Sequence, residues 1–343
     1  MRAVVIHAAK DLRIEEQAPK HPGAGQVRID MAVGGICGSD LHYYNHGGFG
    51  SVRVREPMVL GHEVSGFVAE CGDDVRDLSV GDLVAVSPSR PCRQCQYCQN
   101  GQQNHCENMR FFGSAMPFPH IQGAFRQSLV ADADQCVPAA GLTAGQAAMA
   151  EPLAVCLHGL RQAGDIVGKT VLVTGCGPIG ALVILAARRA GARQIIVTDL
   201  SDYTLEIAKR CGADHMLNIA TKPDALAPWQ TDKGNIDVHL ECSGAAAAIA
   251  SGVAALRPRG VLVQLGMGGD MTIPMQAVTA KEITLRGSFR FHQEFKTAVQ
   301  LMQKGLIDVS PLISHTYSLA DAVEAFDMAG DRTQAMKVQL QLS

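Results

Sequence analysis

Apolar and polar residues follow two patterns along the chain, and the clearer one lies between residues 170 and 284. There, short apolar runs rich in β-branched residues predict strands, and segments with apolar residues at helical spacing predict helices. The predicted strands are 170–174, 194–197, 216–219, 236–242 and 261–265, and the predicted helices are 181–190, 203–210 and 245–256. Such alternation is typical of a doubly wound parallel sheet covered by helices, so the pattern predicts an α/β fold.

The segments on either side of this region are richer in predicted strands. Runs separated by Gly, Pro and Asp predict strands at 27–33, 64–69, 82–87 and 125–130. A helical pattern opens at Glu151–Pro152. The last part of the chain is predicted to contain strands at 282–289 and 337–342 and helices at 294–304 and 321–329. We therefore expect a β-rich domain over 1–150, completed by 285–343, and a second domain over 151–284.

A glycine-rich turn follows the first strand of the central region, at Gly175, Gly177 and Gly180. The pattern G-x-G-x-x-G is weak evidence alone, because the chain has 35 glycines. Its position between a strand and a helix, with Asp199 at the end of the next strand, favours a dinucleotide site. Backbone amides would approach the pyrophosphate at the helix start, and Asp199 would bind the adenosine ribose. Because a carboxylate repels a 2′-phosphate, NAD is expected, although the next residues leave NADP possible.

Four of the eleven cysteines have the spacing C-x2-C-x2-C-x7-C, at Cys92, Cys95, Cys98 and Cys106. Two-residue gaps allow thiolates on one loop to converge on a tetrahedral ion, and four thiolates leave no open position. The pattern therefore predicts a structural Zn²⁺ site. The alternatives are an iron–sulfur cluster, whose usual spacing adds a proline after the last cysteine, and buried free thiols.

A second group of candidate metal ligands is dispersed in the sequence. Cys37 lies in a glycine-rich segment, and His62–Glu63 follow a glycine. Cys, His and one carboxylate form a catalytic zinc set with an open fourth position. The carboxylate is either Glu63 or, from a distance, Glu151, which is also a favourable charge for the start of a helix.

Composition restricts the possible partners. A formal net charge of −3 and an isoelectric point near 6.4 give no basic surface for nucleic acid or an anionic membrane. The opening residues 1–7 are apolar over too short a stretch for a signal peptide, and the apolar span 171–187 contains the glycine turn. We therefore expect a cytoplasmic protein with a small-molecule substrate.

The whole chain resembles the zinc-containing medium-chain dehydrogenases, and within them the polyol branch of sorbitol and xylitol dehydrogenases. The resemblance rests on the glycine turn, the four-cysteine loop, Gly61-His62-Glu63 and Cys37-Gly-Ser-Asp-x-His42. Segments 110–116 and 285–291 are most similar to members that act on sugar acids. The resemblance implies a GroES-like catalytic domain split around a Rossmann domain, one catalytic and one structural zinc per chain, NAD or NADP, and a homodimer or homotetramer.

The resemblance also implies roles for individual residues. It makes Cys37, His62 and Glu63 catalytic zinc ligands, with Glu151 binding the metal directly or through water. It assigns a proton relay and a substrate pocket to Ser39, His42, Tyr43, Phe112 and Arg290. It assigns the cofactor to Gly175, Gly177, Pro178, Ile179, Gly180, Asp199, Leu265, Gly266, Met267, Phe289 and Arg290. From residue types alone, Ser39 could equally be a turn residue, and Tyr43 and Phe112 could be core aromatics.

The expected reaction is oxidation of a secondary alcohol in a sugar acid or a polyol. Arg110 or Arg290 could hold the carboxylate of a sugar acid in a bidentate pair. The sequence departs from sorbitol dehydrogenases at two positions. Phe291 stands where they often have a tyrosine, which argues against sorbitol as the substrate. Thr204 stands where they often have an arginine near the adenine, which argues against equally tight cofactor binding. The competing hypotheses are a neutral polyol substrate and a non-catalytic binding protein with the same fold.

Overall fold

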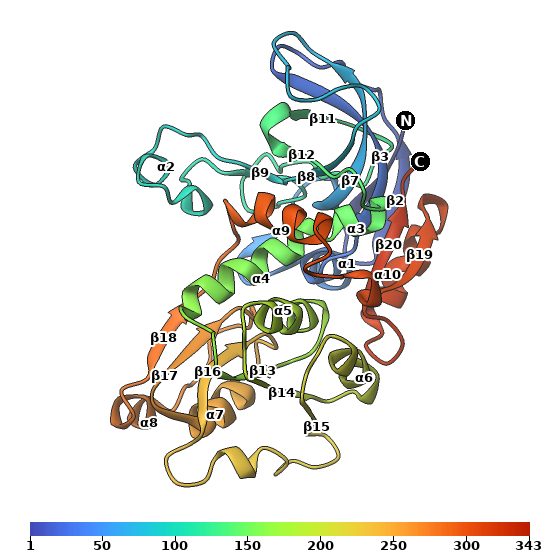
Figure 1. Ribbon diagram of the computed structural model, residues 1–343. Coiled ribbons are helices and arrows are strands. Elements are labelled where there is room, and N and C mark those ends of the chain that lie inside the picture. The colour runs from blue at the N-terminus through green and yellow to red at the C-terminus, as the bar shows by residue number, and fades with distance from the viewer.

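The computed structural model describes residues 1–343 and shows two lobes (Figure 1). The lower lobe in Figure 1 is built on a six-stranded sheet of order β15-β14-β13-β16-β17-β18, in which all neighbours are parallel. Its strands are β13 (Thr170–Thr174), β14 (Gln194–Asp199), β15 (His215–Asn218), β16 (Ile236–Glu241), β17 (Leu256–Gln264) and β18 (Thr284–Gly287). This is the Rossmann order, which confirms the predicted doubly wound sheet.

Helices cover both faces of the Rossmann sheet. The helices of this lobe and of the junction are α4 (Ala150–Ala163), α5 (Pro178–Arg189), α6 (Asp202–Arg210), α7 (Ala246–Ala255), α8 (Met275–Ala280) and α9 (Glu294–Gln303). Val171 and Val173 join a core cluster of 39 residues with α4, α5 and α9, whereas Leu172 joins a cluster of 11 residues with α7. Successive strand residues point to opposite faces, so the continuous apolar run of β13 fills both cores.

The upper lobe contains a mostly antiparallel sheet of order β12-β8-β7-β3-β20-β19, with β11 also paired to β3. These strands are β3 (Gln26–Gly35), β7 (Glu63–Cys71), β8 (Leu83–Val86), β11 (Ser128–Asp132), β12 (Cys136–Pro138), β19 (Ile313–Ser318) and β20 (Lys337–Gln341). Smaller sheets are formed by β1 (Arg2–Ala8), β2 (Asp11–Glu16), β4 (Gly48–Phe49), β5 (Val52–Arg53), β6 (Met58–Val59), β9 (Ser89–Arg90) and β10 (Arg110–Phe111). The helices are α1 (Gly38–His46), α2 (Gln96–Gln99), α3 (Ala144–Ala148) and α10 (Ala322–Gly330).

The chain crosses between the lobes more than once. β20 pairs antiparallel with β3, so the last strand lies in the sheet of the first lobe. β18, which contains the predicted boundary at residues 284 and 285, pairs with β17 and therefore stays in the Rossmann sheet. None of the helices combines the length and the hydropathy that a membrane crossing requires.

Candidate active site

The glycine turn after β13 has the geometry that a dinucleotide requires. Gly175 adopts φ +80°, and a Cβ there would lie 2.9 Å from the Ser243 nitrogen. Gly177 is the N-cap of α5, and no side chain caps this helix. Gly180 packs directly on the Gly175 carbonyl, where a Cβ would clash. The helix N-terminus therefore remains open to an anion such as a pyrophosphate.

Asp199 lies at the carboxyl end of β14, next to this turn. One carboxylate oxygen accepts the Cys176 amide at 2.5 Å, and the other accepts the amides of Leu200 and Ser201. These bonds fix the carboxylate at the edge of the sheet where dinucleotides bind. Arg332, which the sequence did not single out, approaches the same turn, with Nη1 3.8 Å from the Cβ position of Gly177.

The remaining predicted cofactor residues lie beyond the ends of other strands or at the start of α5. Leu265, Gly266 and Met267 follow β17 directly, and the Met267 side chain is 71% exposed. Thr204, which stands in place of a cofactor-binding arginine, is buried in α6 and donates to the Ser201 carbonyl at 2.9 Å. Its hydroxyl is therefore already used within α6.

The four-cysteine loop brings its sulfurs together. The Sγ atoms of Cys92, Cys95, Cys98 and Cys106 all lie within 4.8 Å of one another, and those of Cys95 and Cys106 are 4.0 Å apart. A tetrahedral Zn²⁺ with 2.3 Å bonds places its sulfurs about 3.8 Å apart, whereas a disulfide requires about 2.05 Å. Backbone amides of Gln94 and Cys95 lower the pKa of Cys92 to about 6. The loop therefore fits a structural zinc.

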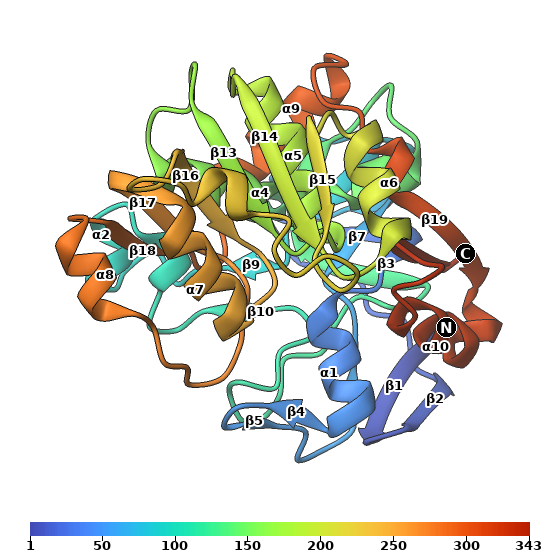
Figure 2. The same cartoon turned by 90° about the horizontal axis from the view of Figure 1, so that it is seen from below.

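The second ligand group is assembled by strand pairing. Cys37 caps α1 just after β3, and His62–Glu63 lie at the start of β7. Gly35 is paired with Glu63 in the ladder between β3 and β7, which brings the two segments side by side. One ligand atom each from Cys37, His62 and Glu63 lies within 4.8 Å of the others. Figures 1 and 2 place α1 on the side of its lobe that faces the Rossmann lobe.

Asp40 orients both of the segments that carry these ligands. It is fully buried, and its carboxylate accepts the Cys37 amide at 3.0 Å and the Gly61 amide at 3.3 Å. Its Oδ1 lies 3.7 Å from Nδ1 of His62, a buried nitrogen without a hydrogen-bond partner. Burial alone would lower the pKa of His62, but Asp40 and Cys37 outweigh it and raise that pKa well above 6.5. A carboxylate behind a ligating imidazole is the usual support of a metal site, and it leaves Nε2 available to the metal.

Lys337 and Glu151 complete the charged surroundings. Lys337 is buried, and its Nζ donates to both oxygens of Glu63 at 2.6 and 2.8 Å and to the Ile36 carbonyl. Burial would lower the pKa of Lys337, but Glu63 raises it, so the ammonium form is kept. Burial raises the pKa of Glu151 to about 7, with His62 opposing the shift. Thiolate, imidazole and carboxylate form the donor set that Zn²⁺ prefers, and the residues fit a catalytic zinc.

The predicted relay and one substrate residue lie on α1. Ser39 is half-buried and His42 is exposed, three residues further along the same helix, so the two face one side. Burial of part of the imidazole, followed by the nearby His46, lowers the pKa of His42. Tyr43 is buried in the core of the first lobe, and its hydroxyl accepts the Ala115 amide at 3.1 Å. The structure therefore gives Tyr43 a packing role in addition to any contact with a substrate.

The strand β10 places neighbouring residues on opposite sides. The Phe111 ring lies 5.6 Å from the His62 ring and 4.6 Å from the Arg290 guanidinium. Arg110 and Phe112 instead line another cavity, on the side of β1 and β11, so the structure does not bring them to the zinc ligands. The sequence could not show whether Phe111 or Phe112 faces the site, because β10 has only two residues and therefore no alternating pattern to read.

Arg290 is the cation that the structure brings to the site. It adopts φ +56°, a left-handed conformation that is strained for arginine, and lies between the rings of Phe111 and Phe289. Burial lowers its pKa, an effect that Glu151 and Tyr43 oppose, which indicates that these groups are close. Phe291, which stands where sorbitol dehydrogenases often have a tyrosine, is buried, and its ring is stacked on that of Phe295 at 5.7 Å. The position is therefore occupied by an apolar core residue.

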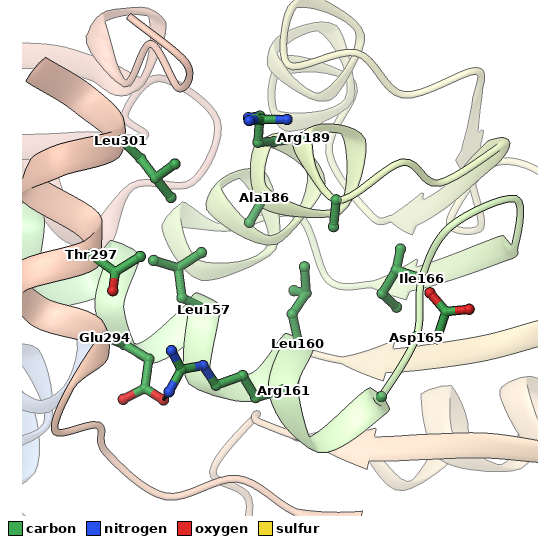
Figure 3. Close-up of a pocket in the computed structure, with 12 residues that line it drawn as sticks. Leu157, Leu160, Arg161, Asp165, Ile166, Ala186, Arg189, Glu294, Thr297 and Leu301 are labelled. Carbon is green, nitrogen blue, oxygen red and sulfur yellow. Dashed lines mark hydrogen bonds and ion pairs between the residues drawn. The ribbon is translucent and has the colours of Figure 1, made fainter. Parts of the chain in front are cut away.

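A cavity of about 380 Å³ between α4, α5 and α9 contains none of the predicted site residues (Figure 3). Apolar side chains such as Leu157 and Leu301 line it, and Arg161 pairs with the buried Glu294 at 2.9 Å. Figure 3 shows this pair at one side of the cavity, with Arg189 at the other. The pair ties α4 to α9 at the junction of the lobes.

Two family profiles match the chain. The "Alcohol dehydrogenase GroES-like domain" matches residues 23–141, and "Zinc-binding dehydrogenase" matches residues 178–304. The chain is 43% identical over 341 residues to L-idonate 5-dehydrogenase (NAD(P)(+)) of Escherichia coli, covering 99% of this chain and 98% of the relative. It is 36% identical over 332 residues to human sorbitol dehydrogenase, covering 95% of this chain and 91% of the relative.

Solved structures agree with these relatives. The crystal structure of the Escherichia coli L-idonate 5-dehydrogenase superposes with a TM-score of 0.95, covering 99% of this chain and 97% of that one. A zinc-binding dehydrogenase from Sinorhizobium meliloti bound to NADP is 28% identical, with a TM-score of 0.89 and coverage of 99% and 98%. Together with the two ligand groups and the glycine turn, these likenesses show that the chain belongs to the zinc-binding alcohol dehydrogenase family, whose members use zinc and NAD(P).

Proposed function

We propose that the protein oxidises L-idonate at carbon 5 to 5-keto-D-gluconate, with NAD(P) as the hydride acceptor. The observation that carries the proposal is the grouping of Cys37, His62 and Glu63 with the half-buried cation Arg290, which has no ion-pair partner, whereas the buried Lys337 is already paired with Glu63. A sugar acid differs from a neutral polyol by a carboxylate, and an arginine held between two aromatic rings provides a bidentate partner for it. The 43% identity to an L-idonate 5-dehydrogenase supports the same substrate.

The chain prepares the site for alcohol oxidation before any substrate arrives. When bound, zinc supplies a Lewis acid that lowers the pKa of an alcohol hydroxyl, and the nicotinamide accepts the hydride. Cys37, His62 and Glu63 would hold the metal, and the Asp40 carboxylate lies 3.7 Å behind Nδ1 of the imidazole, on the side away from Nε2. Lys337 holds the Glu63 carboxylate in place through both of its oxygens. Glu151, whose pKa of about 7 allows both protonation states, would contact the metal through water.

The proton released by the alcohol needs a path to solvent. Ser39 and His42 lie on one face of α1, and His42 is exposed at the surface. We assign them to this path, since the hydroxyl both donates and accepts hydrogen bonds and the lowered pKa of His42 favours its release of the proton to water. Asp199 would bind the ribose diol, and the start of α5 the pyrophosphate.

Steady-state kinetics on zinc-replete enzyme tests the substrate. We expect kcat/KM for L-idonate to exceed that for sorbitol and xylitol by at least roughly tenfold, because a charged pair adds about 1.5–3 kcal/mol. Arg290→Lys should lower kcat/KM for L-idonate more than for xylitol. Arg110→Ala tests the other arginine and should leave both values within about twofold, since its side chain lines another cavity. If L-idonate is not oxidised, or is used no better than neutral polyols, the substrate is a polyol.

We also propose that the protein forms a homo-oligomer through the edge of its Rossmann sheet. β18 is the last strand of that sheet, and all four of its residues are exposed, including Leu285 at 46%. An unpaired edge strand that exposes an apolar side chain invites a second strand, and a two-fold axis would pair β18 with its copy. Leu285→Lys should shift the mass measured by light scattering towards the monomer, and an unchanged mass would remove this interface.

A further inference from the structure

The first lobe has a cavity of about 380 Å³ whose lining includes none of the zinc ligands. It lies between the N-terminal strands, the β9–β10 pair and β11, which Figures 1 and 2 locate. The side chains of Lys20, Arg90, Arg110 and Arg126 line it, and no acidic residue does. Such a gathering of cations is unusual for a chain whose net charge is −3.

Arg126 gives the strongest indication of an anion site among these side chains, because it is only 8% exposed. Its Nε and Nη2 both donate to one carbonyl oxygen, that of Gly123, and Nη1 has no protein partner. Burial lowers its pKa to about 10, so the group is still charged at neutral pH, and no carboxylate compensates it. A buried charge without a counter-ion is costly, and the cost is removed when an anion enters.

The two arginines at the mouth of the cavity add a second, independent observation. Arg90 and Arg110 are directly paired across the β9–β10 ladder, a register that is unfavourable for like charges. Arg90 is partly neutralised by Asp132 at 2.7 Å, but Arg110 has neither an ion pair nor a hydrogen bond, and neither has Lys20. Two cations without a partner therefore line a cavity that is also lined by a buried one.

The remaining lining decides what kind of anion fits. Phe112, Ile121 and Leu129 provide apolar walls. His120 does not add charge, because its Nε2 accepts the Arg55 amide and its Nδ1 donates to the Pro117 carbonyl. A cavity of this size holds a molecule rather than a single ion.

We propose that this cavity is a binding site for a small organic anion, a carboxylate or a phosphate ester, distinct from the catalytic centre. Its charged end is held by Arg126, Arg110 and Lys20, and its carbon body packs on Phe112 and Leu129. The Arg126 anchor, Gly123, lies against the Leu60 backbone, two residues before the zinc ligand His62. Occupation of the cavity therefore acts on the segment that carries a zinc ligand.

Thermal unfolding of the zinc-loaded enzyme with saturating NAD tests the proposal, since NAD fills the cofactor phosphate site. We compare inorganic phosphate, D-gluconate and sodium chloride at matched ionic strength. A specific site gives a saturable rise in Tm of at least ~2 °C with phosphate or gluconate but not with chloride. A stronger response to phosphate identifies phosphate esters as the ligands, and a stronger response to gluconate identifies sugar acids.

Variants assign the response to this cavity. The double variant Lys20→Ala/Arg110→Ala removes two unpaired cations and should weaken anion binding at least tenfold by calorimetry. Arg76→Ala removes an exposed arginine outside the cavity and should leave the affinity unchanged. Arg126→Met should abolish the saturable response, whichever way it changes the Tm without anion. The proposal is wrong if phosphate and gluconate act no better than chloride, or if the double variant binds them as the wild type does.

Discussion

The two cysteine-containing sites differ in how the chain builds them. The four-cysteine loop lies within residues 92–106, and its ligands converge because of local spacing. Cys37 caps α1 just after β3, His62 and Glu63 lie at the start of β7, and their support comes from Asp40 and from Lys337 at the other end of the chain. The first site is a property of one segment, and the second is a property of the fold.

Their electrostatics differ in the same way. At the loop, backbone amides stabilise a partly exposed thiolate at Cys92. At the catalytic group, Glu63 and Lys337 are buried together, and removing either would leave an uncompensated charge. We therefore expect metal loss at the loop to reduce stability and metal loss at the catalytic group to abolish activity.

The largest expected effect follows from removing a catalytic ligand. Cys37→Ala or His62→Ala should lower kcat/KM by roughly 10³-fold or more, because the Lewis acid contributes several kcal/mol to the transition state. Elemental analysis should give one zinc per chain in place of two, since the four-cysteine loop is untouched. Two zinc ions in an inactive variant would contradict the assignment of these ligands.

Removing a ligand from the four-cysteine loop should reduce stability more than activity. Cys98→Ser removes a buried structural ligand and should lower the Tm by several degrees, at about 2–4 °C per kcal/mol lost. The kcat/KM of the folded fraction should fall by less than about tenfold. Cys71→Ser, outside both groups, is the matched control. Loss of activity equal to that of Cys37→Ala, with an unchanged Tm, would remove the distinction between the sites.

A smaller effect is expected at Lys337. Lys337→Met leaves Glu63 without its partner and should weaken zinc binding and kcat/KM by about 10–100-fold, the range for groups that orient metal ligands. Lys337→Arg should restore part of both. The visible spectrum of the cobalt-substituted enzyme should change in Lys337→Met, which a purely structural role would not cause. An unchanged spectrum and unchanged zinc affinity would mean that Lys337 does not position Glu63.

The contrast between the sites also explains what the sequence revealed. The parallel sheet was predictable because each strand and helix of the Rossmann lobe carries its own period, and β13 was predicted to the residue. The strands β1, β2 and β19 were missed. β2 and β19 lack a strong local pattern and are held in place by their pairing partners, whereas β1 does carry a buried apolar run, Ala3 to Ile6. The four cysteines were identified from spacing, whereas the dispersed ligands were only candidates from their residue types and were assigned through the family resemblance.

The supporting residues of the catalytic group had no sequence signal. Asp40 looks like an ordinary helix-start residue, and Lys337 like a charge at the start of the last strand. Only the pairing of β20 with β3 and of β3 with β7 brings Lys337 to Glu63. Which side of β10 faces the site was likewise decided by tertiary structure, and Phe111 took the position expected of Phe112.

The smallest effect concerns a buried histidine that lacks the acidic neighbours of His62. His239 in β16 is fully buried, its Nε2 is 2.8 Å from the Thr174 hydroxyl, and its Nδ1 has no partner, as in His62. Burial lowers the pKa of His239 from 6.5 to about 3, whereas Asp40 raises that of His62. Below pH 6.5 the unfolded chain binds a proton that the folded protein excludes, so folding stability falls as the pH falls towards 3.

This linkage can be measured by urea unfolding between pH 7.5 and 5. From pH 6.5 to 5, His239 should cost the wild type about 1.6 kcal/mol of unfolding free energy, because the slope reaches its full value of about 1.4 kcal/mol per pH unit only below pH 6.5. His239→Asn should lose this part of the pH slope, whatever its stability at pH 7.5, and the exposed His21→Asn should keep it. Equal slopes in the three proteins would show that His239 takes up a proton in the folded state. The acidic neighbours of His62 would then not explain why its pKa differs from that of His239.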